Sequence, residues 1–239
     1  MRKHRVRALL MGGQACVFYG AAEFSRDTDF AILADSTNLA RLRRALADLK
    51  AVPIAVPSLE PRHLRRGHAV HFRCLHPDAF RMRVDLMSRM RGVAPFASLW
   101  RRRTGIKLPD GTHCDLMSLT DLVKAKKTQR DKDWPMIRRL VEAHYFEHRH
   151  GSVCKQVNFW LNELRTAELL AEVAAAHPRA AARIAGRRKA VKAARGGDIK
   201  AAEDALLAEE LAERRADREY WRPLVEELQR LRRSASRSR

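Results

Sequence analysis

The chain has 239 residues, of which 46% are hydrophobic and 32% are charged, a composition typical of a folded globular protein and unlike that of a disordered chain. Its 48 Lys and Arg residues outnumber 28 Asp and Glu residues, giving a formal net charge of +20. This excess favours polyanionic partners such as nucleic acid, although an Arg- and Ala-rich composition with solvated basic faces gives the same number.

The cysteines and the apolar segments limit the class of protein. None of the four cysteines belongs to a C-x-x-C pair, which argues against a zinc ribbon or a thioredoxin-like motif. No segment approaches the roughly 20 apolar residues that a membrane span requires, and the basic N-terminus lacks the apolar run of a signal peptide. We therefore expect a cytoplasmic protein with reduced thiols and no membrane partner.

From Val6 to about Trp134, short apolar runs alternate with turn residues, as in proteins that mix strands and helices. The runs ALLMG and FAILA have strand length, and QACVFYG between them has room for only a short helix. The segment STNLARLRRALADLK is predicted to be an amphipathic helix with Ser36 as its capping residue. A proline-containing connector, residues 53–61, follows it.

Two further strands are expected in AVHFRC and FRMRVDLMS. Strict alternation in the second segment places the apolar residues, among them Val84 and Leu86, on one face, and Arg83 and Asp85 on the other. The next segment, GIKLPDGTHCDLM, is predicted to form a hairpin, because an Asp-Gly pair between two strand-like runs suits a tight turn with positive φ. Asp85 is thus expected to project from a sheet face.

The remainder of the chain is helical in pattern. The segment SLTDLVKAKKTQRDKDWPMIRRLVEAHYFEHRH suits two helices, with Pro135 in the first turn of the second. After Gly151 the apolar residues recur at helical spacing among many charges, with almost no strand signal. The expected fold class is therefore α+β: residues 1–150 form a mixed sheet flanked by helices, and residues 151–239 form a basic helical region.

A glycine pair, Gly12-Gly13, follows the first apolar run. Without a Cβ atom the backbone can approach a phosphate closely, and a helix that begins there points its N–H groups at the anion. The pair lacks the Lys-Ser/Thr ending of a P-loop and the three glycines of the dinucleotide fingerprint. A simple turn is the alternative explanation.

Two acids, Asp27 and Asp29, lie two residues apart at the start of a probable strand, so both carboxylates point to one face and can share hard divalent cations. Asp85 adds a third carboxylate from a neighbouring strand, and three acids can hold two Mg²⁺ ions about 3.5 to 4 Å apart across a transferring phosphoryl group. A D-x-D pair also serves as a cap, a turn or a surface ion-pair partner. A phosphatase of the haloacid-dehalogenase type is disfavoured, because its apolar strand precedes the nucleophilic aspartate, whereas here the apolar run follows.

In their order along the chain, these motifs resemble the signature of the nucleotidyltransferase superfamily typified by DNA polymerase beta. The signature consists of an apolar run, Gly12-Gly13, a short helix, and Asp27-Thr28-Asp29 leading into FAIL. VDL around Asp85 resembles the third acidic strand of that superfamily. DLVKAKKTQRDKDW resembles the helix and turn after the catalytic sheet in minimal bacterial nucleotidyltransferases, including those related to abortive-infection and toxin–antitoxin systems. The resemblance covers roughly residues 5 to 145.

This resemblance implies a mixed sheet that bears the acids, and Mg²⁺-dependent transfer of a nucleoside monophosphate from a nucleoside triphosphate to a hydroxyl group, with release of pyrophosphate. Asp27 and Asp29 would bind two Mg²⁺ ions and the triphosphate, and Asp85 would complete a metal site and assist deprotonation of the acceptor. The residues implied to line the phosphates are Gly12, Gly13 and Ser25.

The basic cluster that follows the acids supplies the cation expected opposite the metals. Lys126 is the predicted contact to the triphosphate. The other candidates in the cluster are Lys124, Lys127, Arg130 and Lys132. A solvated helix end is the alternative for this cluster, since Lys and Arg are favourable near a helix C-terminus. The histidines His68, His71, His76 and His113 lack a helical i,i+4 pairing near an acid and are expected in ordinary polar positions.

The acceptor is expected to be an RNA end or a protein hydroxyl group, with the basic helical region binding RNA phosphates or docking a protein partner. Aromatic residues are only 6% of the chain, which gives little support to a stacking platform for single-stranded bases. Two alternatives stay open: a toxin-type enzyme regulated by an antitoxin partner, and a non-catalytic nucleic-acid-binding protein on the same fold. The enzyme requires the three acids, whereas the binding protein tolerates Asn in their place.

Overall fold

The computed structural model describes residues 1–237 and confirms the α+β class. Its strands are β1 (Ala8–Met11), β2 (Asp27–Ile32), β3 (Val52–Pro53), β4 (Val70–Arg73), β5 (Arg83–Met87), β6 (Thr104–Lys107) and β7 (His113–Leu116). Its α-helices are α1 (Gly12–Phe18), α2 (Ser36–Asp48), α3 (Pro61–Arg66), α4 (Phe96–Arg102), α5 (Leu119–Ala125), α6 (Asp133–His148), α7 (Cys154–Glu163), α8 (Ala167–Ala176), α9 (Pro178–Ala185), α10 (Lys189–Arg195) and α11 (Ile199–Arg237). Two short 3₁₀ helices cover Arg2–His4 and Pro77–Ala79.

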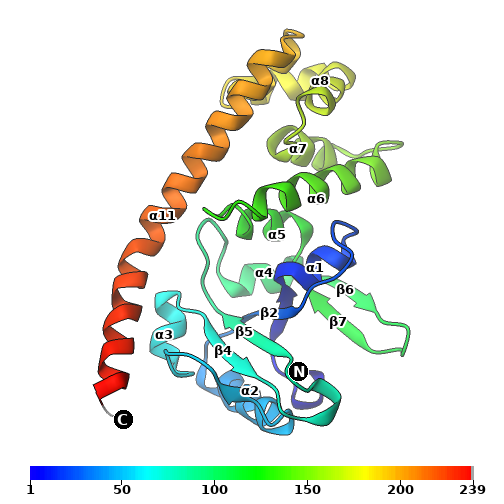
Figure 1. Ribbon diagram of the computed structural model, residues 1–239. Helices are drawn as coiled ribbons and strands as arrows, with labels where there is room; N and C mark the ends of the chain where they lie inside the picture. The colour runs from blue at the N-terminus through cyan, green and yellow to red at the C-terminus, as the bar shows by residue number, and fades with distance from the viewer. Residues whose placement is uncertain (238–239) are drawn as a thin grey trace. The chain divides into compact units, whose positions relative to one another are not determined.

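The strands form one mixed sheet in the order β3-β4-β5-β2-β1-β7-β6 (Figure 1). β2 pairs with β5 and β1 with β7 in parallel, and the other neighbouring pairs are antiparallel. The predicted hairpin is confirmed, since β6 and β7 pair directly and Gly111 in their turn has a φ of 82°. The two acidic strands, β2 and β5, are therefore direct neighbours in the middle of the sheet.

The chain divides into two compact units. Unit 1 comprises Met1–Phe18, Ala22–Ala125 and the described residues from Glu219 on; unit 2 comprises Tyr19–Ala21 and Lys126–Arg218. The change of character in the sequence suggested a boundary near residue 150, whereas contacts separate the chain after Ala125 and again after Arg218. The last described part of the chain thus belongs to the unit that contains the sheet.

One hydrophobic core of unit 1 lies between α2 and one face of the sheet. Helix α2 contributes Leu39, Leu42 and Leu46, and the strands contribute Ile32 from β2 and Val84 and Leu86 from β5, all of them buried. Side chains alternate along a strand, so the residues between these positions face the opposite side of the sheet. That opposite face carries the three acids.

The cap of helix α2 lies one residue earlier than expected. The side chain of Asp35, and not that of Ser36, accepts a hydrogen bond from the backbone N–H of Asn38 at 2.6 Å, and Ser36 is the first helical residue. Asn38 in turn bridges to the backbone of Arg7 and Leu33. The correction has a physical cause, since both side chains can cap a helix and tertiary contacts choose between them.

Unit 2 is helical, as the sequence predicted for the region after Gly151. Trp160, Leu161, Leu164 and Leu170 are fully buried in it. Pro135 occupies the first turn of α6 as expected, where its missing N–H costs no hydrogen bond. Among the described residues, no helix combines the length and apolar character that a membrane span needs.

Candidate functional site

The three predicted acids share one face of the sheet. Asp29 and Asp85 are direct partners in the parallel pairing of β2 and β5, and Asp27 precedes Asp29 by two residues. Neighbouring strands lie about 4.8 Å apart, so the two partnered backbones hold their carboxylates side by side. Asp27 is exposed at the start of β2, and Asp29 and Asp85 are partly buried. The expected juxtaposition of the acids on one face is therefore present at the level of the backbone.

The glycine pair is packed against this face. A Cβ atom on Gly12 would lie 1.9 Å from Oδ2 of Asp29, and Gly12 has a φ of 68°, a conformation that disfavours any other residue. A Cβ atom on Gly13 would lie 2.3 Å from Oγ of Ser25. The structure thus brings together Gly12, Gly13, Ser25 and Asp29, four of the residues assigned to the site from sequence. Both glycines are needed for close approach.

The segment that carries Ser25 is tied to α1. Gln14 donates a hydrogen bond from its side-chain amide to the backbone oxygen of Ser25 at 2.8 Å, and the Ser25 hydroxyl donates to the backbone oxygen of Asp27 at 3.2 Å. These bonds hold the connection between α1 and β2 beside the glycines. The start of β2 is therefore positioned by side chains as well as by strand pairing.

Asp85 has two basic neighbours that the sequence reasoning did not assign to the site. Its Oδ1 lies 2.8 Å from Nδ1 of His71 on β4 and accepts a hydrogen bond from Nε of Arg83 at 2.8 Å. His71 is the cross-strand partner of Asp85, and Arg83 precedes Asp85 by two residues on β5. The alternation of β5 placed Arg83 on the acidic face, but only the pairing of β4 with β5 reveals His71.

These contacts set the ionisation of the acidic face. Burial raises the pKa of Asp85, but the hydrogen bonds from His71 and Arg83, with their charges, outweigh burial and leave that pKa below its ordinary value. The pKa of Arg83 is raised, mainly by its hydrogen bond to Asp85 and further by the charges of Asp27 and Asp29. Asp85 is therefore a carboxylate at neutral pH, and Arg83 interacts with all three acids.

The donor set suits a hard divalent cation, because carboxylate oxygens are the ligands that Mg²⁺ prefers in proteins. Asp85, however, directs one oxygen to His71 and Arg83, and residues 1–237 contain no group of three His, Cys, Asp or Glu side chains that could hold a metal ion as they stand. The backbone register fits a metal site. Both contacts use Oδ1 of Asp85, so an ion shared with Asp29 would bind the other oxygen, Oδ2, or would require Asp85 to leave Arg83.

Lys126, the predicted triphosphate contact, belongs to unit 2 and has a local partner there. Its Nζ lies 3.1 Å from Oδ1 of Asp133, a buried acid that also accepts hydrogen bonds from Thr128 and Arg130. Burial raises the pKa of Asp133, but the charge of Lys126 and the hydrogen bond from Thr128 lower it by more than burial raises it. The pKa of Asp133 therefore lies below its ordinary value. Lys126 anchors this turn, and its contact with a triphosphate stays a prediction.

The other cations of that cluster differ in their surroundings. Lys127 pairs with Glu163 at 2.8 Å, whereas Lys124 and Lys132 are exposed. Of the histidines expected in ordinary polar positions, His68 is buried, with Nε2 3.4 Å from Glu227 of α11, and both residues belong to unit 1. His71 alone among the four contacts one of the predicted acids.

The ion pair of Asp85 predicts a specific pH dependence of stability. Its folded-state pKa lies below the ordinary 3.8, so ionised Asp85 stabilises unit 1 above that pH, and this contribution is lost as the pH falls through the folded-state pKa. We expect the stability advantage of the wild type over Asp85→Asn to hold from about pH 5 to about pH 4 and to shrink below it. Urea denaturation between about pH 5 and about pH 2.5 measures it. An advantage that grows as the pH falls would contradict the assigned ion pair.

No protein-family model matches the chain, and no curated protein shows a significant match to it. The resemblance to nucleotidyltransferases therefore rests on the order of the motifs in the sequence.

Proposed function

We propose that this protein is a Mg²⁺-dependent nucleotidyltransferase that moves a nucleoside monophosphate from a nucleoside triphosphate to a hydroxyl group of an RNA or protein acceptor, with release of pyrophosphate. The observation that carries the proposal is the register of β2 and β5, which sets Asp29 beside Asp85 on a face that Asp27 shares. The close approach of Gly12 to the carboxylate of Asp29 supports it, because the glycine pair and the acids then belong to one site.

In this proposal the residues of the site bind the metal ions and the triphosphate. Asp27, Asp29 and Asp85 would hold two Mg²⁺ ions, which when bound lower the pKa of an attacking hydroxyl group and neutralise charge on the triphosphate. The backbone around Gly12 and Gly13 would receive the phosphates, with the hydroxyl of Ser25 beside it. Lys126 stays the predicted lysine contact to the triphosphate.

Arg83 has a further role in this proposal. Without substrate it neutralises part of the charge on Asp85, at a separation of 2.8 Å. When Asp85 turns toward Asp29, the guanidinium of Arg83 is released, and guanidinium groups bind phosphate oxygens in bidentate geometry. Arg83 would then bind the triphosphate, and His71 would keep its contact with Asp85 and orient the carboxylate toward the acceptor hydroxyl.

A second candidate is a non-catalytic nucleic-acid-binding protein on the same fold. The observation that favours it is the satisfied state of Asp85, whose oxygen is already bound by Arg83 and His71. In this alternative the three acids only balance local positive charge, and the formal net charge of +20 provides the affinity.

The proposed reaction would take place in the cytoplasm. Nucleoside triphosphates and reduced thiols both occur in the cytoplasm, and the four cysteines are free thiols. A toxin-type role under the control of an antitoxin partner rests on the family resemblance alone.

The experiment that separates the two candidates is a transfer assay. The purified protein is incubated with Mg²⁺, each of the four α-labelled nucleoside triphosphates, and either total RNA or cell protein. We expect label to move onto a macromolecule with the wild type and to fall by about 10³-fold in the double variant Asp27→Asn, Asp29→Asn, because the charge facing the cations is lost.

Asp78→Asn is the matched control, since Asp78 is an exposed carboxylate in the 3₁₀ helix Pro77–Ala79, with a side chain 90% exposed. Its transfer rate is expected to equal that of the wild type. Transfer at the wild-type rate by the double variant would overturn the metal-site assignment. If no mixture is labelled and nucleotide binding is independent of Mg²⁺, the binding-protein candidate replaces the enzyme.

A further inference from the structure

Positive charge is concentrated in one part of unit 2. Between Glu172 and Asp198 the chain contains no acid, but it contains seven Lys and Arg residues. These residues belong to α9, α10 and their connection, which we call the basic hairpin, residues 178–195. The part of α11 in the same unit, residues 199–218, contains six acids and four Lys or Arg residues. Within unit 2, therefore, the basic hairpin differs in charge from the rest of the unit.

The fold of unit 2 turns this charge outward. The apolar residues Ala181 and Ile184 of α9, and Ala190, Val191 and Ala194 of α10, are buried. Six of the seven cations are exposed, and none of the six has an acidic partner within residues 1–237; they are Arg179, Arg183, Arg187, Lys189, Lys192 and Arg195. Their charge is therefore not balanced by the protein itself.

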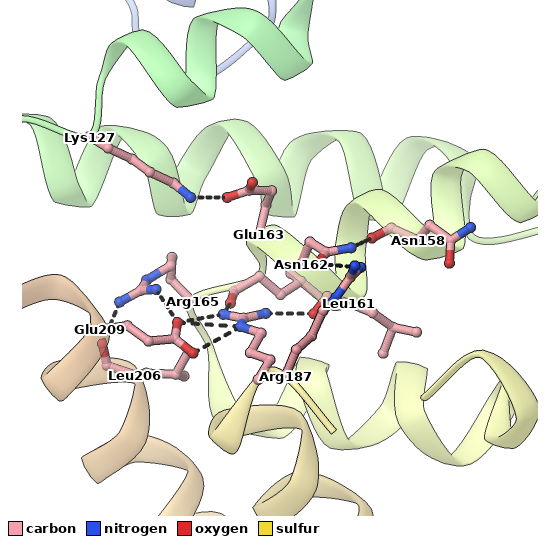
Figure 2. Close-up of polar contacts among 11 residues, drawn as sticks. Lys127, Asn158, Leu161, Asn162, Glu163, Arg165, Arg187, Leu206 and Glu209 are labelled. Atoms are coloured by element: carbon pink, nitrogen blue, oxygen red, sulfur yellow. Dashed lines mark hydrogen bonds and ion pairs between the residues drawn. The ribbon is translucent and has the colours of Figure 1, made fainter. Parts of the chain in front are cut away.

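Arg188, the seventh cation, points inward and fixes the basic hairpin to its neighbours. It donates hydrogen bonds to the backbone oxygens of Leu161 at 2.7 Å and Leu164 at 2.8 Å, where α7 ends, and it pairs with Glu209 of α11 at 3.1 Å. Figure 2 labels Leu161 and Glu209 of this network, and it shows that Glu209 also binds Arg165. The exposed cations are thus carried on helices that the buried guanidinium of Arg188 links to α7 and α11.

The spacing of the exposed cations suits a phosphate backbone. Arg179 and Arg183 are four residues apart on α9, and Lys189, Lys192 and Arg195 follow one another at intervals of three on α10. Such intervals place side chains on one side of a helix at steps of about 4.5 to 6 Å along its axis. The only other exposed residues between Arg179 and Arg195 are Ala182 and Gly186, whose small size leaves a phosphate free to approach.

The same surface is unsuited to an apolar protein partner. Protein interfaces are anchored by buried aromatic or aliphatic side chains, and no exposed large hydrophobic residue of the described chain lies between residues 177 and 197. It also lacks an aromatic residue on which a base could stack. What the surface offers is a set of unpaired cations, which bind the nucleic-acid backbone without reading its bases.

We propose that the basic hairpin is a docking surface for the phosphate backbone of RNA and that it holds the RNA acceptor of the proposed transferase. The assignment to RNA rests on the proposed function: an RNA end carries both a 2′ and a 3′ hydroxyl group as acceptors, whereas a DNA end lacks the 2′ hydroxyl. Recognition through phosphates alone makes this docking independent of base sequence.

The test compares two variants of equal charge. One carries Arg183→Gln, Lys189→Gln, Lys192→Gln and Arg195→Gln in the basic hairpin. The control carries Arg139→Gln, Lys155→Gln, Arg215→Gln and Arg218→Gln, four exposed cations elsewhere in unit 2. Each set lowers the formal net charge of +20 by four, and glutamine preserves helix propensity. Circular dichroism confirms that both variants are folded.

Binding of a labelled RNA hairpin is then measured without nucleotide at several salt concentrations. We expect the basic-hairpin variant to bind at least about tenfold more weakly than the control at low salt, and its slope of log affinity against log salt to be smaller by about 3, because up to four phosphate contacts are lost. Equal weakening in the two variants would overturn the surface, since only total charge would then matter. Tighter binding of DNA of the same sequence would overturn the assignment to RNA.

The result is distinguishable from failure of the proposed function. The Asp27→Asn, Asp29→Asn variant is expected to bind the RNA hairpin at least as tightly as the wild type, because it keeps every cation of the basic hairpin and loses two negative charges. RNA binding that depends on the basic hairpin, in a protein that transfers no nucleotide, supports the docking surface and refutes the transferase. If the basic-hairpin variant binds RNA as tightly as the control and the protein transfers nucleotide, the docking surface is refuted and the transferase is not.

Discussion

Replacing Gly12 by alanine is expected to destabilise unit 1 by about 2 to 5 kcal/mol and to abolish the proposed nucleotide transfer. Two causes add. Gly12 has a φ of 68°, in the left-handed region that costs any other residue about 1 to 2 kcal/mol. Its new Cβ would also lie within 2.8 Å of the Oδ2, Cγ and Cβ atoms of Asp29. The Asp29 side chain must therefore move from its position beside Asp85. Thermal unfolding and the transfer assay measure the two effects.

Gly20→Ala is the matched control for this variant. Gly20 has nearly the same φ, 72°, but no atom lies within 4 Å of the position of a new Cβ. It should therefore lose only the backbone contribution of about 1 to 2 kcal/mol and keep its activity. If the two alanine variants were equally stable and equally active, the close approach of Gly12 to Asp29 would have no energetic or functional importance.

The second large effect concerns Arg188, whose replacement by glutamine is expected to destabilise unit 2 by about 2 to 4 kcal/mol. The guanidinium is buried and serves three partners, the backbone oxygens of Leu161 and Leu164 and the carboxylate of Glu209. Glutamine is too short and has too few donors to satisfy them, and buried acceptors without partners lose the hydrogen bonds that water would give them. The stability of Arg188→Lys should lie between that of the wild type and that of Arg188→Gln. Lysine keeps the positive charge, but its ammonium group lacks the planar fork of donors.

Arg187→Gln controls for the loss of one positive charge at the adjacent position. Arg187 is exposed and makes one hydrogen bond, to the side chain of Asn162 at 3.2 Å, so its replacement should change stability by less than about 0.5 kcal/mol. Urea denaturation of the three variants beside the wild type gives the comparison. Equal stabilities for the glutamine variants at 187 and 188 would show that the buried network contributes nothing to the fold.

The sequence by itself determined every strand except β3, most helices and the face on which the acids lie, because these features depend on local periods. Alternation in RMRVDLM places Asp85 opposite the buried Val84 and Leu86, and the structure has it there. The D-x-D spacing puts Asp27 and Asp29 on one face for the same reason. The hairpin around Gly111 also followed from neighbouring residues.

Tertiary structure decided which side chains meet, since those contacts join residues far apart in the chain. Pairing of β2 with β5 sets Asp29 beside Asp85, and pairing of β4 with β5 brings in His71, which no local pattern linked to the acids. Asn38 of α2 likewise bonds to the backbone of Arg7, 31 residues away.

The basic hairpin depends both on local sequence and on tertiary contacts. The sequence alone shows its lack of acids, but Arg187 and Arg188 are adjacent residues of the same kind, and only their tertiary contacts distinguish them: Arg188 binds the backbone oxygens of Leu161 and Leu164 and the carboxylate of Glu209. Arg188 reaches acceptors that are buried and is retained inside, whereas Arg187 is left at the surface. Local periodicity assigns residues to faces, and the contacts available on each face then decide which charges the protein satisfies itself and which it leaves exposed to a partner.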